Sequence, residues 1–284
     1  MKLRLLFLTN PENDALEEDE LVERVLKRNF DLIVSHPLDC LHFLAEVDGV
    51  VIRNIWPTHE YQEQWEWVKE CLRESDLPIY NPLTLKGDIE GKDYLVTLYK
   101  QRYPVIPSID DLRQIDKLPD TNDYWIKPKK SCDGVGAKRV TKDVLLRLEL
   151  KDYVIQPFVE FQYEPSFFYI DNRFQHAISA KHRLWQDRTS SYQAHSNDLA
   201  FAAKFVRWAD VPYGTLRVDA VRLNDGRLLL TEIENLCPYL YLPEVGQSTR
   251  QDFLNAFAGS VIRALSKTQP EEAAVEHNNE LLTK

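Results

Sequence analysis

Four charged residues on two neighbouring apolar runs have the types and spacing for shared chemistry. The stretch RVDAVRLNDGRLLLTEIE carries an Asp-Gly dipeptide between two β-prone runs, which predicts a hairpin with a two-residue turn at Asp225-Gly226. Counting outward from that turn pairs Val221 with Leu230 and sets the register of every residue beyond them. Because side chains alternate across a strand, four charged residues then share one face of the hairpin. These residues are Arg217, Asp219, Glu232 and Glu234.

The predicted register places like charges opposite each other. Asp219 faces Glu232, Glu234 faces Arg217, and Asn235 points to the other face. Facing carboxylates repel, so a positive charge is expected between them. In one interpretation Arg217 neutralises the group and the rest of the face is solvated. In the other the carboxylates bind a divalent cation; without a nearby His or Cys they suit Mg²⁺, which shares its remaining positions with water and phosphate.

A glycine-containing loop is the candidate phosphate-binding element that a magnesium site requires. In DYWIKPKKSCDGVGAKRV a predicted strand ends at Lys127-Pro128, and the chain resumes as a strand at AKRVT. Small residues let backbone N–H groups approach phosphates, and a strand-borne lysine adds a fixed positive charge. No Gly-Lys-Ser/Thr opens a helix, so this is not a Walker A loop. A plain hairpin turn with lysines around it is the alternative. The small residues of the loop are Ser131, Gly134 and Gly136.

Composition limits the classes of function. The 284 residues include 45 acidic and 35 basic ones, a formal net charge of -10, with no long run of Lys and Arg, which argues against nucleic acid as the main partner. The N-terminal run LLFL is too short for a secretion signal, and no stretch approaches the roughly 18 apolar residues of a membrane span. The sequence therefore predicts a cytoplasmic protein without membrane association. The cysteines lack C-x-x-C spacing and are expected to be reduced, structural thiols. They are Cys40, Cys71, Cys132 and Cys237.

The elements that must position these residues follow two patterns. In the N-terminal part, strands and helices alternate, which predicts a parallel sheet with helices packed on it. The strands are expected at residues 3–9, 31–36 and 48–54 and the helices at 15–29 and 61–75. A short helix is predicted at 92–101, and strand pairs dominate beyond it. Those strands are expected at 123–128, 137–141, 153–159, 165–171, 174–181, 214–223 and 227–234, with a helix at 250–267.

Together these features resemble the ATP-grasp family, in which two α+β subdomains close on ATP. The resemblance runs in order over nearly the whole chain. It implies an α/β N-terminal domain with a parallel sheet and helices at residues 1–84, then an α+β ATP-grasp fold of two subdomains at 85–268, its lid subdomain at about 108–158, and a loose tail at 269–284. Segments such as DGVVIRNIW and EIENLCPYLYL are similar to the branch that contains the O-ureido-serine cyclo-ligase of cycloserine biosynthesis. Glutathione synthetases and the ribosomal-protein glutamate ligase are more distant relatives.

The resemblance implies an ATP site with magnesium. In the family, one lysine at the start of the nucleotide-binding part and another before the glycine loop contact ATP; here these are Lys92 and Lys127. A hinge strand and a following acidic residue hold adenine and ribose. They correspond to Gln156, Phe158, Val159 and Glu164. The magnesium ligands, for one ion or two, come from a strand pair of the form Arg-x-Asp and Glu-x-Glu. They correspond to Asp219, Glu232 and Glu234, beside Arg217.

Catalytic and substrate residues follow the family less closely. Gly91 stands where an Asp usually precedes the first lysine, and KHRLWQDRTSSYQAHS matches only loosely the arginine-containing loop over the reactive phosphate. Lys181 and Arg188, with Arg217, are the residues that would act there. Arg53 and Trp56 follow a predicted strand end, where ligands bind in open α/β sheets. They are candidate substrate contacts, as is His176, although a lone Arg or His in such a place is more often structural. These candidates are Lys181, Arg188, Arg217, Arg53, Trp56 and His176.

The activity implied by the resemblance is amide-type bond formation. A substrate carboxylate would be phosphorylated by ATP, and a nitrogen nucleophile would capture the acyl phosphate with release of ADP and phosphate. The substrates would be a small amino-acid-like or peptide carboxylate and an amine. The protein itself would be a monomer or a homodimer. Two alternatives are an ATP-grasp kinase that stops at a phosphorylated product and a nucleotide-binding regulatory protein without turnover.

Overall fold

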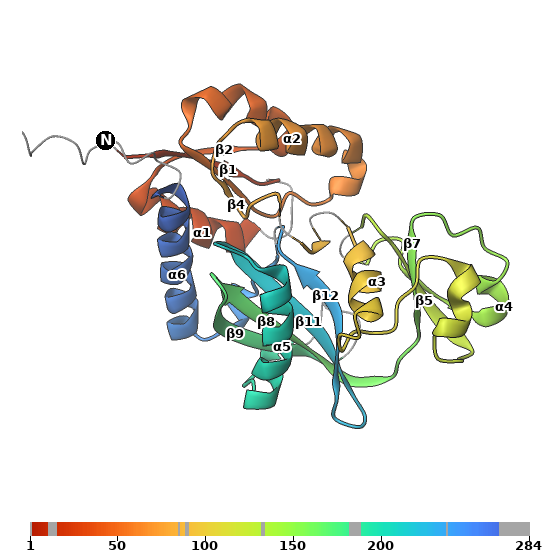
Figure 1. Cartoon of the computed structure of the whole chain (residues 1–284). Coiled ribbons are helices and arrows are strands. Elements are labelled where there is room, and N and C mark those ends of the chain that lie inside the picture. The colour runs from red at the N-terminus through yellow and green to blue at the C-terminus, as the bar shows by residue number, and fades with distance from the viewer. Residues whose placement is uncertain are drawn as a thin grey trace, which may run out of the picture.

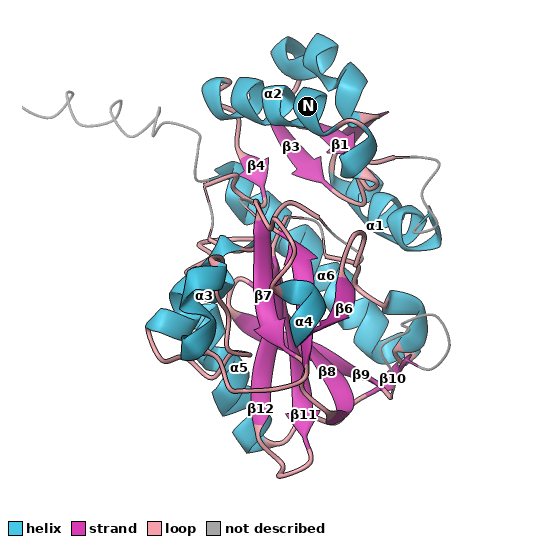
Figure 2. Cartoon of the chain, turned by 90° about the vertical axis from the view of Figure 1, so that its right-hand side faces the viewer, coloured by secondary structure: helices cyan, strands magenta, loops and turns pink. Residues whose placement is uncertain are grey.

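Strands of three sheets build the molecule. The structure is a computed structural model that describes residues 2–10, 16–84, 86–88, 91–131, 134–181, 189–236 and 238–266. In Figure 1 the first sheet lies at the top, the third in the centre and the second to the right. In Figure 2, after a quarter turn, the first sheet again lies at the top and the second sheet lies in front of the third. The third sheet comes last in the chain. Where it meets the first sheet, residues from the two ends of the sequence therefore lie together.

The first sheet is parallel, as the alternation of strands and helices predicted. Its strand order is β2-β1-β3-β4, and each neighbouring pair runs in the same direction. The two middle strands are almost wholly buried and nearly continuously apolar, as expected for parallel strands covered on both faces. The strands are β1 (Arg4–Leu8), β2 (Asp31–Ser35), β3 (Gly49–Ile52) and β4 (Ile79–Tyr80); the helices are α1 (Leu16–Asn29) and α2 (Gln62–Glu74), with 3-10 helices η1 (Pro37–Glu46) and η2 (Thr58–Glu60).

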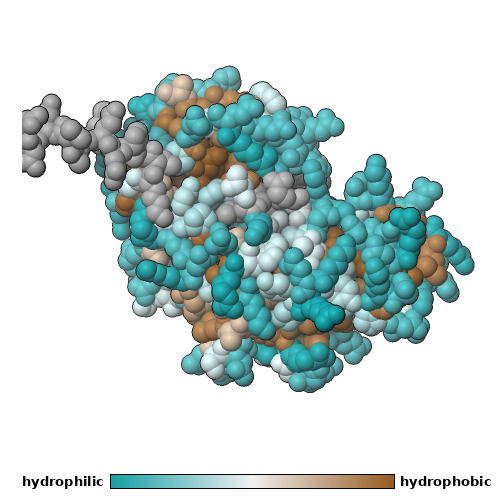
Figure 3. All heavy atoms as spheres, in the orientation of Figure 1, coloured by the Kyte–Doolittle hydropathy of each residue, from teal (hydrophilic) through white to brown (hydrophobic). Residues whose placement is uncertain are grey.

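The surface over the first sheet is partly apolar. Figure 3 shows hydrophobic side chains gathered there on a face that is otherwise largely hydrophilic. Val34 on the edge strand β2 and Leu38 in η1 are among the exposed apolar residues. Of the described helices, none combines the length and the apolar character that crossing a membrane requires.

The second sheet is small and has its own core. Its strands are antiparallel in the order β6-β5-β7. Tyr124 and Ile126 on β5 and Ile155 on β7 are buried and form a cluster separate from the larger cores. The elements are η4 (Leu112–Lys117), β5 (Asp123–Pro128), β6 (Lys138–Thr141), α4 (Lys142–Leu145) and β7 (Tyr153–Pro157).

The third sheet is antiparallel, in the order β10-β9-β8-β11-β12, and is covered on both faces. Phe205 of α5 belongs to the apolar cluster on one face, and Phe257 of α6 to the cluster on the other. In Figure 1, α6 stands beside α1, so it also packs against the first sheet's helix layer. The elements are β8 (Phe161–Ile170), β9 (Arg173–Ala180), β10 (Thr189–Ser191), α5 (Ser196–Ala209), β11 (Thr215–Leu223), β12 (Leu228–Glu234), η5 (Leu242–Glu244) and α6 (Gln247–Ser266).

Most predicted elements are confirmed, but some were missed. The structure contains α5, which the sequence reading left without an element, as well as η1 and the short β4 and β10. The mixed α/β fold with a parallel sheet is confirmed. The division into domains at residues 84 and 268 stays a prediction, and the tail at 269–284 lies outside the described residues. Cys40 and Cys71 are free thiols; Cys132 and Cys237 lie outside the described part.

Helix α3 (Asp93–Lys100) lies between the first and second sheets in the chain and contacts β12 of the third sheet through Tyr94. The Tyr94 hydroxyl accepts a hydrogen bond from the backbone N–H of Ile233 at 2.7 Å. Tyr94, Leu95 and Leu98 bury the inner face of the helix. Its first turn therefore sits against β12, and Lys92, which precedes the helix, is brought to the carboxylate strands.

A buried ion pair fixes the segment after β12 to the first sheet. Arg53, 1% exposed, lies 2.6 Å from Glu18 Oε1 and donates to the Pro238 carbonyl oxygen at 2.6 Å. Glu18 also accepts hydrogen bonds from the backbone N–H groups of Leu240 and Leu242. Burial raises the pKa of Glu18 to about 7, although the charge of Arg53 acts in the opposite direction. The pair is thus a structural tie between α1, the end of β3 and residues 238–242.

Removing one partner of this tie should destabilise the fold. We expect Arg53→Ala to lower the free energy of unfolding by about 3 to 5 kcal/mol, because it leaves the Glu18 carboxylate buried without its counter-ion. Urea unfolding followed by circular dichroism measures this. The matched control is Arg113→Ala, which removes an exposed Arg–Asp pair and should leave stability essentially unchanged. Equal effects of the two substitutions would contradict the role given to Arg53.

Candidate functional site

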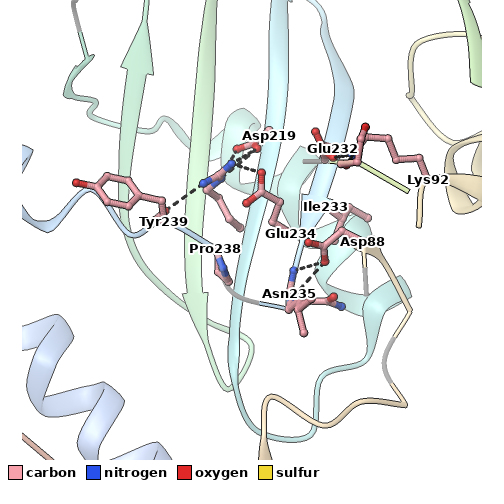
Figure 4. Close-up of polar contacts among 12 residues, drawn as sticks. Asp88, Lys92, Asp219, Glu232, Ile233, Glu234, Asn235, Pro238 and Tyr239 are labelled. Carbon is pink, nitrogen blue, oxygen red and sulfur yellow. Dashed lines mark hydrogen bonds and ion pairs between the residues drawn. The ribbon is translucent and has the colours of Figure 1, made fainter. Parts of the chain in front are cut away.

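The acidic hairpin has the charged pairs that the sequence predicted. Arg217 pairs with Glu234 and Asp219 with Glu232 across β11 and β12. Figure 4 shows Asp219, Glu232 and Glu234 on these strands, with Glu232 directed toward Lys92. The hairpin therefore gathers its charged side chains on one face.

The turn of the hairpin differs from the prediction. A two-residue turn at Asp225-Gly226 was wrong: Leu223 donates its backbone N–H to the Arg227 carbonyl oxygen at 2.9 Å, which closes a loop of three residues. Gly226 has a φ of 85°, the left-handed conformation that such loops place last and that glycine adopts without a Cβ clash.

A bulge restores the register at the site. Ala220 pairs with Leu230, but its neighbour Asp219 pairs with Glu232, so Thr231 is an extra residue on β12. The predicted pairing of Val221 with Leu230 was therefore wrong. The longer loop shifts the register by one residue and the bulge shifts it back, which is why the outward count was correct for the carboxylates.

Arg217 is held between two carboxylates. Its Nε donates to both oxygens of Asp219 at 3.0 Å, its Nη1 donates to the Tyr239 carbonyl oxygen at 3.1 Å, and its Nη2 donates to Glu234. Burial raises the pKa of Glu234 well above its usual range; the carboxylates of Asp219 and Glu232 act in the same direction and Arg217 against it. The first interpretation of the sequence, neutralisation by Arg217, describes this arrangement.

Lys92 joins the glycine loop to the acidic hairpin. Its Nζ donates to the Ser131 carbonyl oxygen at 2.5 Å and forms an ion pair with Glu232. Burial opposes the charge of Lys92, but the Glu232 carboxylate raises the pKa of Lys92 above its usual value. Burial likewise opposes the charge of Glu232, yet Lys92 and then Lys127 hold its pKa below the usual value. Lys92, the loop and Glu232 thus meet at one place, and the charge of Lys127 also acts on Glu232.

The described part of the loop has backbone geometry that needs glycine. Gly134 and Gly136 both have a φ of 72°, and a Cβ on Gly136 would lie 2.8 Å from the Pro128 side chain. Ser131 Oγ donates to the Pro128 carbonyl oxygen at 3.2 Å. Residues 132 and 133, between Ser131 and Gly134, lie outside the described part. The glycines therefore allow the chain to turn back tightly after β5.

Asp88 is a site residue that the sequence reading missed. Its Oδ1 accepts hydrogen bonds from the backbone N–H groups of Asn235 at 2.8 Å and Leu236 at 3.2 Å. Burial raises the pKa of Asp88 to about 6, and Glu232 acts in the same direction. Figure 4 shows it beside the end of β12. The only local signal was an acidic residue after Gly87, which is common in loops and gives no partner.

Asn235 lies away from the carboxylate face, as the alternation predicted. Its side-chain nitrogen donates to the Lys86 carbonyl oxygen, and its backbone carbonyl accepts from the Asn81 side chain. Asn81 also bonds both the N–H and the carbonyl of Thr215, at the start of β11. Asn81 therefore holds together the ends of the two strands that carry the charged residues.

The predicted adenine and ribose residues lie along β7 and β8. Gln156 is buried and donates to Ser108 Oγ at 2.9 Å. The Arg139 guanidinium lies over the Phe158 ring at 3.7 Å, and Val159 follows on the half-buried connection to β8. Glu164 on β8 pairs with Ala180 on β9. Their contact with a nucleotide stays a prediction.

The remaining candidates fall in different surroundings. Lys181 is exposed at the end of β9, and Arg188 lies outside the described residues. Arg53 is buried in its pair with Glu18, so its guanidinium faces the protein interior. Trp56 is half-buried, and its carbonyl oxygen accepts a hydrogen bond from the Asn10 side chain. The contacts of Arg53 with Glu18 and of Trp56 with Asn10 therefore lie outside the acidic hairpin.

His176 lies in an apolar core. Its ring stacks on Phe168 with a centroid distance of 4.3 Å and meets Phe253 edge-on at 5.3 Å. Nε2 lies 3.0 Å from the Leu240 carbonyl oxygen, which suits a donated hydrogen bond. Burial lowers the pKa of His176 to about 4, so the ring is neutral near pH 7.

The oxygen donors on the hairpin fit magnesium in kind. In the described part of the chain, no group of three or more His, Cys, Asp or Glu is arranged to hold a metal ion. Mg²⁺ usually takes only one or two carboxylates and completes its shell with water and phosphate, so Asp219, Glu232 and Glu234 still suit it. As placed, however, Arg217 and Lys92 occupy positions on these carboxylates.

The arrangement of the three sheets is similar to that of solved ligase structures. D-cycloserine synthetase DcsG is 20% identical to this chain with a TM-score of 0.74, over 92% of this chain and 99% of that chain. D-alanine–D-alanine ligase from Bacillus anthracis complexed with ATP is 14% identical with a TM-score of 0.64, over 94% of this chain and 100% of that chain. The ATP-grasp ligase PsnB, complexed with a phosphomimetic variant of minimal precursor, Mg and ADP, is 12% identical with a TM-score of 0.57, over 94% and 99%. No family model and no curated protein matches the sequence.

The core position of His176 has a pH consequence. Its pKa is depressed in the folded state, so its contribution to stability is complete above about pH 6.5 and is lost as the pH falls toward 4. Between pH 7 and pH 5 we expect this group to remove about 2 kcal/mol from the free energy of unfolding. Chemical unfolding of the wild type and His176→Gln at both pH values measures the difference. An identical pH dependence in both proteins would contradict the neutral, buried state.

Proposed function

We propose that the protein is an ATP- and Mg²⁺-dependent carboxylate–amine ligase that acts through an acyl phosphate. The observation that carries this proposal is the position of Lys92, whose ammonium touches both the Ser131 carbonyl of the glycine loop and Glu232 of the acidic hairpin. A phosphate-binding loop and magnesium carboxylates must meet at the same point to act on a nucleotide. The relatives whose structures contain ATP, or Mg and ADP, support the choice of ligands.

Each group of residues has a role that its chemistry suits. Lys92 and Lys127 would bind the phosphates, and the loop from Ser131 to Gly136 would cover them and exclude water. Asp219, Glu232 and Glu234 would hold magnesium, which when bound neutralises charge on the transferred phosphoryl group. Gln156, Phe158, Val159 and Glu164 would hold adenine and ribose.

The chemical step would depend on position and charge. Arg217 contacts two of the three carboxylates and would stabilise the anionic acyl phosphate, together with Lys181 and with Arg188 beyond the described residues. Catalysis that works by holding the substrate carboxylate in line with the nucleotide phosphate requires no nucleophilic side chain from the protein. We also propose the domain division at residues 84 and 268, with a lid subdomain at about 108–158 that contains the second sheet.

The decisive experiment is a panel of amino acids and small peptides scored by ADP release, with products identified by mass spectrometry. We expect one carboxylate–amine combination to give ADP, phosphate and a condensed or cyclised product. A stable phosphorylated product without condensation would indicate a kinase instead. If the protein binds ATP but no member of the panel causes ADP release, the regulatory alternative is favoured.

Glu232→Gln tests the acidic hairpin in the same assay. We expect ATP turnover to fall by about 100-fold or more, because the substitution removes a charge from the phosphate site while keeping the side-chain shape. The matched control is Asp225→Asn at the exposed tip of the same hairpin, which should retain full turnover. Unchanged turnover in Glu232→Gln would show that the magnesium site is placed wrongly.

A further inference from the structure

Arg217 occupies the oxygens that the proposed magnesium site would use. Its guanidinium reaches Asp219 through Nε and Nη2, and Nη2 also contacts Glu234. The side chain is 8% exposed, so little water screens the contact. Figure 4 shows Asp219 and Glu234 close together on the paired strands, a separation that one guanidinium spans.

A guanidinium and a divalent cation compete for these oxygens. Both are positive, and at a few ångströms in a poorly solvated site their repulsion is strong. Arg217 has further anchors, because Nε stays on Asp219 and Nη1 is bonded to the Tyr239 carbonyl oxygen. Its contact with Glu234 is therefore the one that can be given up while the side chain keeps its place on β11.

We propose that Arg217 is the resident counter-ion of the acidic pair and that it releases Glu234 when a divalent cation binds. Nη2, which keeps its ion pair with Asp219, can then donate to a substrate carboxylate, an anion that a guanidinium recognises in a planar contact. Arg217 thereby links cation binding to recognition of an anionic substrate, and by reciprocity the anionic substrate strengthens cation binding. This inference rests on the proposed ligase function and adds an order of events to it.

The test measures binding of Mn²⁺ alone, without nucleotide, by the loss of its free electron paramagnetic resonance signal. Arg217→Met should bind Mn²⁺ at least about tenfold more tightly than the wild type, since a competing charge is gone. The matched control is Arg222→Met, which removes another arginine of β11 whose partner is Asp198 and should leave Mn²⁺ affinity unchanged. Equal or weaker affinity in Arg217→Met would overturn the proposal.

A second variant covers the case in which Arg217→Met does not fold. Arg217→Lys keeps the charge, but its single ammonium cannot span Asp219 and Glu234 as the guanidinium fork does. We expect it to bind Mn²⁺ more tightly than the wild type, and wild-type affinity in this variant would overturn the proposal. The outcome is separate from the ligase assay. Tighter Mn²⁺ binding by the Arg217 variants, with no ADP release by the wild type on any substrate, would support the release of Glu234 by Arg217 and contradict the proposed ligase function. Unchanged Mn²⁺ binding by the variants, with ADP release by the wild type, would support the ligase function and overturn the proposal for Arg217.

Discussion

Carboxylates can lie beside one another in this chain, Asp219 buried and Glu232 and Glu234 half-buried, because buried cations pair with them. Glu232 takes Lys92 as its partner, and Asp219 and Glu234 share Arg217. The Lys92–Glu232 pair joins segments that are 140 residues apart in sequence, whereas Arg217 pairs within the hairpin itself. Neutralising Glu232 therefore also brings the start of α3 to the hairpin. Without these cations the charges would oppose the packing of α3 against β12, since an unpaired charge in such a place costs several kcal/mol.

Residues 238–242 extend the same constraint to the first sheet. Their backbone groups bond Arg53, Glu18, Arg217 and His176, which come from α1 and from strands of the first and third sheets. Two of these side chains, Arg53 and His176, were substrate candidates in the sequence. Each bonds a backbone carbonyl oxygen more than sixty residues away, and no local pattern reveals such a contact. Polar residues near a strand end can thus serve architecture as readily as binding.

The fold was more predictable than the site. Apolar alternation gave the parallel sheet and the bounds of most strands to within a few residues, because those signals are local. Helix α5 was missed, although Phe201 and Phe205 lie one turn apart and are buried against the third sheet. The charged pairs of the hairpin were predictable from alternation, whereas the role of Asp88 was not. Its hydrogen bonds to residues 235 and 236 depend on how two distant segments pack.

The bulge at Thr231 divides the hairpin into two parts with different tasks. Beyond it, toward the tip, Leu230 lies in the same apolar core as Ile233, although the two are three positions apart on one strand. In a regular strand residues three apart would face opposite sides, so Leu230 would lie among the carboxylates. The extra residue thus lets one strand present acids to the site and leucine to the core within five positions. The tip can then change in length or sequence while the spacing of the acids, fixed on the other side of the bulge, stays the same.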